Sequence, residues 1–203
     1  MNSKTHTLWT IQTIDAWNEL QNNGFLTGKE QFIDPYFKRG YDWMKDQMKS
    51  RIEKPKTENI YPIWAWYQYQ NSNKRKPDLR GTGFTKKGQE AVRIEFVKKR
   101  KSILLSDFGL WHYPLNYMTY IGSNKSDALK FKKKLQNHNL ENSQFDQLPI
   151  TFQNEIKTSW NKIFDMNFQD PYYTTPFDQK QIQATFWELR IDKVVKVDRF
   201  RAK

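Results

Sequence analysis

Cysteine is absent from this chain of 203 residues, and histidine is rare, with only His6, His112 and His138. Without cysteine the protein has no disulfide framework and no thiolate ligand for a metal ion. The three histidines lie far apart, and their neighbours do not have the spacing of metal ligands, so they form no zinc signature. The sequence therefore predicts that no metal is bound.

Long apolar runs and export signals are also missing. No apolar stretch approaches the roughly 20 residues that cross a bilayer as a helix, and 28% of the residues are charged. The opening segment, MNSKTHTLWTIQT, lacks the basic and then apolar pattern of a secretory signal. We therefore expect a cytoplasmic protein without a membrane partner, and its lysine-rich composition favours a bacterial source with an AT-rich genome.

The signature motifs of several common enzyme classes are not present. The sequence has no Walker motif, no G-x-G-x-x-G, no G-x-S-x-G and no paired-histidine metal motif. These absences argue against the common nucleotide triphosphatases, dehydrogenases, serine hydrolases and zinc hydrolases.

Positive charge is what the chain has in excess, because 34 Lys and Arg against 22 Asp and Glu give a net charge of +12. The densest runs, expected in loops or at element ends, are Lys74, Arg75 and Lys76, and then Lys98, Lys99, Arg100 and Lys101. Long cationic side chains in such places can reach a phosphate backbone, so these residues are candidate nucleic-acid contacts. The alternative interpretation is a charged surface that only keeps the protein soluble.

The pattern of the chain predicts one α+β domain over residues 1–203. Strands are predicted at 7–13, 60–69, 91–97, 102–106, 182–189 and 193–200, and helices after Thr13, after Asp34-Pro35 and over 151–164. Both faces of 60–69 are aromatic, so this strand should be central in the sheet. Residues 98–101 are predicted to form a hairpin tip leading into 102–106. Residues 122–148 are predicted to form a Lys/Asn-rich insertion.

Several blocks of the sequence resemble, as a set, an uncharacterised bacterial family of domains of unknown function. They are LWTIQT at 8–13 with Trp17, YPIWAWYQ at 61–68, KPDLR at 76–80, LLSDFGLWH at 104–112 and IQATFWEL at 182–189. The resemblance covers nearly the whole chain apart from the lysine-rich stretch near 122–148. It implies membership of a family but no particular activity.

The segment LWTIQTIDAWNELQNNGFL at 8–26 is also similar, more distantly, to the first strand and helix of ADP-ribosyltransferase-like folds. This resemblance implies that architecture, with NAD as the cofactor. The first strand of those folds carries a His or Arg that anchors NAD, and here the matching position is Thr10, with Gln12 nearby. Their near-terminal strand carries a catalytic Glu, and the matching position here is Gln183, unless the register shifts and Glu188 takes the role.

Under this hypothesis the candidate catalytic residues are Glu188, Gln183 and His112. A carboxylate beside the nicotinamide ribose stabilises an oxocarbenium-like transition state, and an imidazole suits general acid–base catalysis. Each residue also has a plainer interpretation. Glu188 would be an exposed acid paired with a neighbouring cation, Gln183 an amide satisfied within the core, and His112 a packing residue.

A second set of residues is expected to bind the cofactor. Nicotinamide is flat and needs aromatic walls, and Arg80 suits a pyrophosphate. The cofactor candidates are Trp9, Thr10, Gln12, Trp64, Tyr67, Gln68 and Arg80. The alternative is that the aromatic rings only pack the core, that the amides bond within it, and that Arg80 pairs with Asp78.

Three functions remain open from the sequence. The first is an ADP-ribosyltransferase-like enzyme that modifies a nucleic-acid or nucleotide target, as a toxin or phage-defence effector with a protein partner such as an antitoxin. The second is a non-catalytic RNA- or DNA-binding module, whose aromatic residues stack on bases. The third is a protein-interaction domain. The enzyme requires Glu188 or an equivalent acid in the same cleft as Thr10 and Trp64.

Overall fold

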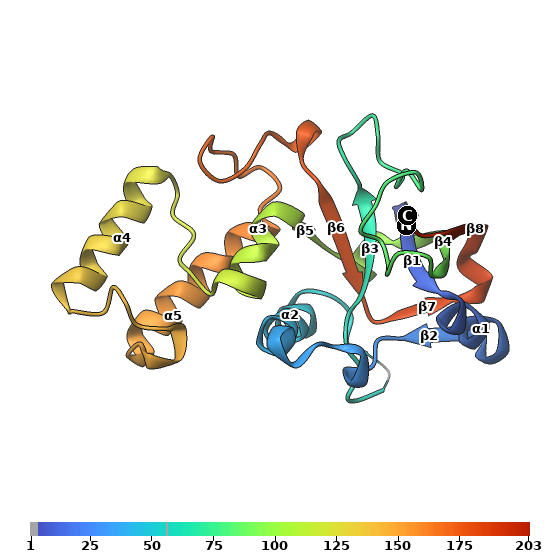
Figure 1. Ribbon diagram of the computed structural model, residues 1–203, viewed down its shortest axis with the longest axis horizontal. Helices are drawn as coiled ribbons and strands as arrows, with labels where there is room; N and C mark the ends of the chain where they lie inside the picture. Colours follow the sequence, from blue (N-terminus) through green and yellow to red (C-terminus); the bar gives the residue numbers. More distant parts are fainter. Residues whose placement is uncertain (1–3, 56) are drawn as a thin grey trace.

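Six strands form one antiparallel sheet in the order β5-β6-β3-β1-β4-β8. The fold is seen in a computed structural model that describes residues 4–55 and 57–203 (Figure 1). The strands are β1 (Thr5–Thr13), β3 (Ile63–Gln68), β4 (Glu90–Lys99), β5 (Leu104–Asp107), β6 (Ile182–Phe186) and β8 (Val194–Arg201). A separate small ladder pairs β2 (Phe25–Thr27) with β7 (Glu188–Arg190). The predicted α+β class is confirmed.

The helices are α1 (Ile14–Asn23), α2 (Lys38–Arg51), α3 (Phe108–His112), α4 (Lys125–Asn137) and α5 (Ile150–Ser159). The ends of α1 follow from local chemistry. Thr13 accepts a hydrogen bond from the Ala16 amide at 3.2 Å, and Gly24 ends the helix with a left-handed φ of 76°. Asp34 and Pro35 begin a short 3-10 turn, η2 (Pro35–Phe37), which leads directly into α2.

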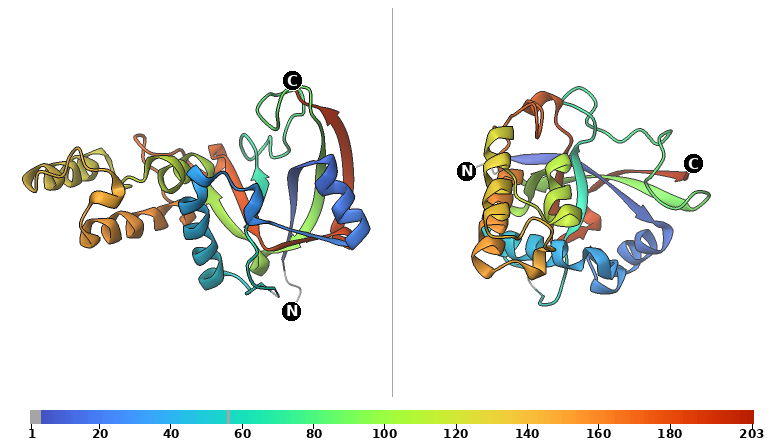
Figure 2. Two further views of the ribbon diagram at one scale, coloured as in Figure 1. Left: turned by 60° about the horizontal axis from the view of Figure 1, so that its bottom comes forward. Right: turned by 60° about the vertical axis from the view of Figure 1, so that its left-hand side comes forward.

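Strand alternation divides the buried side chains between the two faces of the sheet. On one face, Leu8, Ile94 and Phe96 pack with Leu20 of α1 and Leu26 of β2. On the other face, a second cluster joins the sheet to α2, α3 and α5, through side chains that include Met44, Leu104, Trp111, Phe152 and Trp160. Figures 1 and 2 show α4 and α5 extending beyond the β5 edge of the sheet, so the molecule is elongated.

Several predicted elements are confirmed. Strand β3 is central, because it pairs with β1 on one side and with β6 on the other. The predicted helix over 151–164 is α5 followed by the 3-10 turn η6 (Trp160–Phe164). Residues 122–148 contain α4 and the short turn η5 (Phe145–Gln147). Among the described residues, no helix has the length and apolar character needed to span a membrane.

Two predictions about the strands are wrong, one about a hairpin and one about the extent of a strand. Residues 98–101 do not join a hairpin, because β4 pairs with β1 and β8 while β5 pairs with β6. The long partners of β4 occupy both of its edges, so the four-residue β5 finds its partner at the opposite side of the sheet. The predicted strand 182–189 is also two strands, since β6 belongs to the main sheet and β7 to the small ladder.

Candidate functional site

A cleft opens where β1 and β3 diverge. The two strands are in register at Trp9 and Trp66, and beyond this pair side chains bridge the gap. The Thr10 hydroxyl donates to the Trp64 carbonyl oxygen at 2.7 Å, and Gln12 Nε2 donates to the Thr10 hydroxyl at 2.7 Å. Gln12 also lines the cleft, whose volume is about 530 Å³. Ligand pockets commonly have volumes of about 300–1,000 Å³, so the cleft can hold a small molecule.

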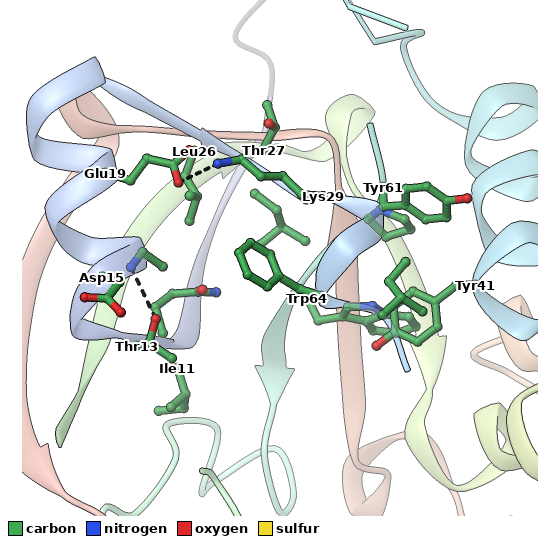
Figure 3. A pocket seen from close by; sticks show the side chains of 17 residues that line it. Ile11, Thr13, Asp15, Glu19, Leu26, Thr27, Lys29, Tyr41, Tyr61 and Trp64 are labelled. Carbon is green, nitrogen blue, oxygen red and sulfur yellow. Dashed lines mark hydrogen bonds and ion pairs between the residues drawn. The ribbon is translucent and has the colours of Figure 1, made fainter. Parts of the chain in front are cut away.

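Five segments build the walls of this cleft, which we call the β1–β3 cleft. They are the end of β1, the first turns of α1, residues 26–33, Tyr41 of α2, and the start of β3. Figure 3 shows Thr13 and Asp15 on one side and Trp64 and Tyr41 on the other. The cleft is therefore assembled from segments that are distant in sequence, and Thr13 serves both as the cap of α1 and as part of the wall.

Opposite charges meet across the mouth of the cleft. Glu19 of α1 and Lys29 form an ion pair at 2.7 Å (Figure 3). Nearby, Lys38 bonds to Glu30, Asp42 and the Tyr61 hydroxyl, at 3.1, 2.9 and 2.8 Å respectively. The hydrogen bonds of Lys38 to Tyr61, Asp42 and Glu30 raise its pKa. These contacts fasten the segment after β2 to α2 and β3.

Aromatic rings form one side of the cleft. The Trp64 ring lies 5.9 Å from the Tyr41 ring and 4.9 Å from that of Trp111, centre to centre. Burial raises the pKa of Tyr41. Phe32 also lines the cleft although 76% of its surface is exposed. A large apolar ring held in solvent at the mouth of a cleft suits contact with the flat ring of a ligand.

The structure separates the three predicted catalytic residues from this cleft. Glu188 lies opposite Thr27 in the β2–β7 ladder and lines a neighbouring hollow with Lys54 and Lys98. Gln183 lies opposite Trp66 on β6. His112 of α3 contacts Asn116 at 2.7 Å, and burial lowers its pKa. Thr27 lines both hollows, so Glu188 is adjacent to the β1–β3 cleft without lining it.

The predicted cofactor residues are only partly brought together. Thr10, Gln12 and Trp64 form the hydrogen-bonded chain beside the cleft. The remaining four are placed elsewhere. Trp9 donates to Glu95 at 2.9 Å, and the Tyr67 ring packs against His6. The buried Gln68 amide donates to the carbonyl oxygens of Phe177 and Lys180. The exposed Arg80 is bound to Asp78.

The two predicted basic runs have different surroundings. In the first run, Arg75 donates to the Tyr67 carbonyl oxygen at 3.0 Å, and Lys76 pairs with Glu95 at 3.2 Å, so two of its three cations are bonded within the fold. In the second run, Lys98 donates to the Glu188 carbonyl oxygen at 2.7 Å and burial lowers its pKa. Lys99, Arg100 and Lys101 are exposed.

The sequence interpretation missed most of the cleft. Asp15, Glu19, Lys29, Tyr41 and Tyr61 line it, and none was a candidate. A usable signal was the spacing after α1, where Gly24 ends the helix and Gly28 follows four residues later. Gly28 bridges to Tyr61, and a side chain there would overlap the Tyr61 carbonyl group. This close approach brings the residues after β2 to the start of β3.

A buried ionic cluster was also missed. Lys180, with its side chain fully buried, pairs with Asp107 at 2.9 Å and bonds to Thr174 and to the Phe168 carbonyl oxygen. Asp107 also caps α3 by accepting from the Leu110 amide. Every group in this cluster has a partner within the fold, so its role is to fasten the loop before β6. Within residues 4–55 and 57–203, no three His, Asp or Glu side chains gather as a metal site would require.

Comparison with known proteins identifies the family but no characterised relative. No curated protein and no solved structure matches the chain. A family model described as "Domain of unknown function (DUF3841)" matches residues 7–195. This confirms the resemblance to an uncharacterised family, and the match spans nearly the whole chain. The chain belongs to the DUF3841 family.

Proposed function

We propose that this DUF3841 domain is an ADP-ribosyltransferase-like enzyme that binds NAD in the β1–β3 cleft and modifies a nucleic-acid or nucleotide acceptor. The observation that carries the proposal is the cleft itself. It opens beside Thr10, the position that matches the NAD-anchoring residue of those enzymes, and it is lined by the nearby Gln12. Strand β3 lies between β1 and β6, so the opening and near-terminal motifs are separated by one strand only.

The cleft offers each part of NAD a chemically suitable contact. Trp64 and Tyr41 provide an aromatic wall for a flat ring, and the exposed Phe32 ring at the mouth can cover it. Lys29 is the cation at the mouth that a pyrophosphate would attract. Gln12 provides an amide oxygen for a ribose hydroxyl or the nicotinamide amide, because its Nε2 is already bonded to Thr10.

A carboxylate is needed beside the reacting ribose. In the transfer, the bond between the ribose carbon and the nicotinamide nitrogen breaks, and neutral nicotinamide leaves. The acceptor oxygen or nitrogen then bonds to that carbon and loses its proton to solvent. Carboxylates stabilise the oxocarbenium-like state between these events. Asp15 and Glu19 line the cleft, and we assign this role to Glu19.

Glu19 can stabilise the ribose only after its ion pair with Lys29 opens. With the cleft empty, Lys29 neutralises Glu19 at 2.7 Å. A bound pyrophosphate would compete for Lys29 and release the carboxylate toward the ribose. This pair is partly exposed, so it is weak enough to exchange partners.

The proposal is tested by thermal unfolding with and without NAD, together with release of nicotinamide. NAD at a hundredfold excess over its dissociation constant should stabilise the folded protein by about 2.7 kcal/mol. We expect Gln12→Ala to lose most of the shift in melting temperature. Glu19→Gln should keep the shift and lose nicotinamide release. Glu188→Gln, in the neighbouring hollow, is the matched control and should retain both.

Two results would contradict the proposal. One is an unchanged melting temperature for the wild-type protein at millimolar NAD. The other is a shift that survives in Gln12→Ala but is lost in Glu188→Gln, which would move the site to the hollow beside β7. A non-catalytic nucleic-acid-binding module is the second candidate function, and the exposed cations of the second basic run favour it.

A further inference from the structure

Three chain segments place their cations at one end of the sheet. Lys4 precedes β1, Arg51 ends α2, and Arg100 and Lys101 follow β4, and these four side chains line a hollow of about 300 Å³. A second hollow of about 160 Å³, lined by Lys54 and Lys98, lies beside it. The left view of Figure 2 shows the start of β1 and the end of α2 toward the same end of the molecule.

We call this surface the basic track. Its cations are Lys4, Arg51, Lys54, Lys98, Lys99, Arg100 and Lys101. The carboxylates at these hollows are Glu53, which pairs with Lys101 at 2.5 Å, and Glu188. Within the described residues, Lys4, Lys54 and Lys99 are exposed and their side chains make no hydrogen bond or ion pair. The track therefore has an excess of cations that the fold itself does not neutralise.

The positive charge of the track lowers the pKa values of two titratable groups. The hydrogen bond from Lys101 and the charges of Lys101, Lys99 and Lys98 hold the pKa of Glu53 below its ordinary value. Burial lowers the pKa of His6, and the charges of Arg100, Lys4 and Arg75 lower it further. Because these two groups belong to different segments, the field extends across the track.

The track leads toward the β1–β3 cleft. Its second hollow is lined by Lys98, Ser102 and Glu188 and also by Thr27, which lines the cleft as well. Thr27 and Glu188 face each other in the β2–β7 ladder. A flexible chain lying along both hollows would therefore reach the edge of the cleft.

We infer that the basic track binds the phosphate backbone of a single-stranded nucleic acid and directs it to the cleft as the acceptor. The acceptor role rests on the proposed function, whereas binding of the strand does not. Exposed cations around a hollow that is also lined by the apolar side chains of Ile52 and Ile103 suit a flexible backbone that bends into it. A membrane surface fits less well, because the exposed large apolar side chains of the described residues lie off the track.

The test uses fluorescence anisotropy with labelled single-stranded RNA and DNA of mixed sequence, without NAD, over a range of salt concentrations. The triple variant Lys4→Gln, Lys54→Gln, Lys99→Gln removes three track charges from residues that are not bonded within the fold. Since each phosphate contact adds about 0.7 to the salt slope for single strands, the slope should fall by about 2. The affinity should fall on the order of tenfold at moderate salt.

The matched control removes the same net charge from the far end of the molecule, through Lys130→Gln, Lys132→Gln and Lys133→Gln on the exposed side of α4. It should retain the wild-type affinity and salt slope. Equal losses in the two triple variants, or no binding of either strand by the wild-type protein, would overturn the inference. Nicotinamide release measured without nucleic acid reports on the cleft alone, so failure of the track and failure of the proposed function give different results.

Discussion

At the scale of single residues, Lys180 has an unusual position for a lysine. Its ammonium is fully buried and bonds to Asp107, Thr174 and the Phe168 carbonyl oxygen, at 2.9, 2.9 and 2.8 Å. Its three donors therefore have three acceptors, which is what burial of an ammonium requires. The cluster connects the loop before β6 to the junction of β5 and α3, so it fixes the start of the strand that carries Gln183.

Removal of one partner from this cluster should be strongly destabilising. We expect Lys180→Met to lower the free energy of unfolding by about 3–5 kcal/mol, because it leaves the Asp107 carboxylate buried without its counter-charge. Urea unfolding followed by circular dichroism measures this change. The double variant Lys180→Met, Asp107→Asn removes both charges and retains a side chain that can cap α3.

This double variant should be more stable than Lys180→Met alone. If the two proteins had the same stability, the buried charge would not be the source of the loss, and the missing side-chain packing of Lys180 would explain it. The comparison therefore separates the ionic contribution from the apolar contribution of the lysine side chain.

At the scale of elements, the β1–β3 cleft depends on how closely β2 approaches β3. Gly28 bridges to Tyr61, and the Tyr61 amide donates to the Gly28 carbonyl oxygen at 3.0 Å. A Cβ atom at position 28 would overlap the Tyr61 carbonyl group. Only glycine permits this approach, which sets the distance between the two segments that border the cleft.

We expect Gly28→Ala to lower the free energy of unfolding by about 1–3 kcal/mol, in the range of other overpacked sites. It should also reduce the NAD-dependent shift in melting temperature, because Leu26–Lys29 and Tyr61–Trp64 would have to move apart. Gly109→Ala is the control, since a Cβ there would lie 3.4 Å from its nearest atom. A Gly28→Ala protein with wild-type stability and NAD response would show that the cleft does not depend on this approach.

Sequence patterns predicted elements more reliably than their pairing. The pattern of residues 91–97 correctly predicted a strand, β4, and in the structure Val92, Ile94 and Phe96 of this strand are in the core. The same pattern could not show that β4 pairs with β8 rather than with β5, because that choice depends on competition between strands about 100 residues apart. Trp187 is buried, with 6% of its surface exposed, and it lies between β6 and β7. In the sequence it continues the pattern of the predicted strand 182–189.

At the scale of the whole molecule, the two hydrophobic clusters share their strands. Leu105 and Phe186 belong to the cluster beneath α1, whereas Leu104 and Trp187 belong to the cluster with the helical end. Adjacent residues of an extended chain point to opposite faces, so β5, and β6 together with the residue that follows it, contribute to both clusters at once. If one cluster lost its packing, the strands that it shares with the other cluster would be exposed to solvent on one face.

We therefore expect one cooperative unfolding transition. Urea curves from circular dichroism and from tryptophan fluorescence should have the same midpoint. Trp17 lies in the first cluster and Trp160 in the second. The difference between the wild-type fluorescence curve and that of Trp17→Phe or Trp160→Phe therefore gives the signal of each of these two residues. An earlier transition reported by Trp160 would show that the helical end unfolds as a unit of its own.

The candidate site could be predicted from the sequence only in part. Thr10, Gln12 and Trp64 were found because they lie in strand motifs, at the end of β1 and at the start of β3. Glu19, Lys29 and Tyr41 were not found, because they reach the cleft only through the packing of α1, α2 and the segment after β2. No local pattern distinguishes a cleft-lining acid on an amphipathic helix from one that faces solvent.

The sequence by itself determined the properties that depend on neighbours in the chain. These are the caps of α1, the faces of the strands, the net charge of +12 and the family. Tertiary structure alone decided which strands pair, where the cleft opens, and which cations are neutralised within the fold. Lys76 is held by Glu95 while Lys99 is left exposed, and this difference depends on residues brought near by the fold. Contacts between distant segments depend on competition among all possible partners, and a local pattern does not record that competition.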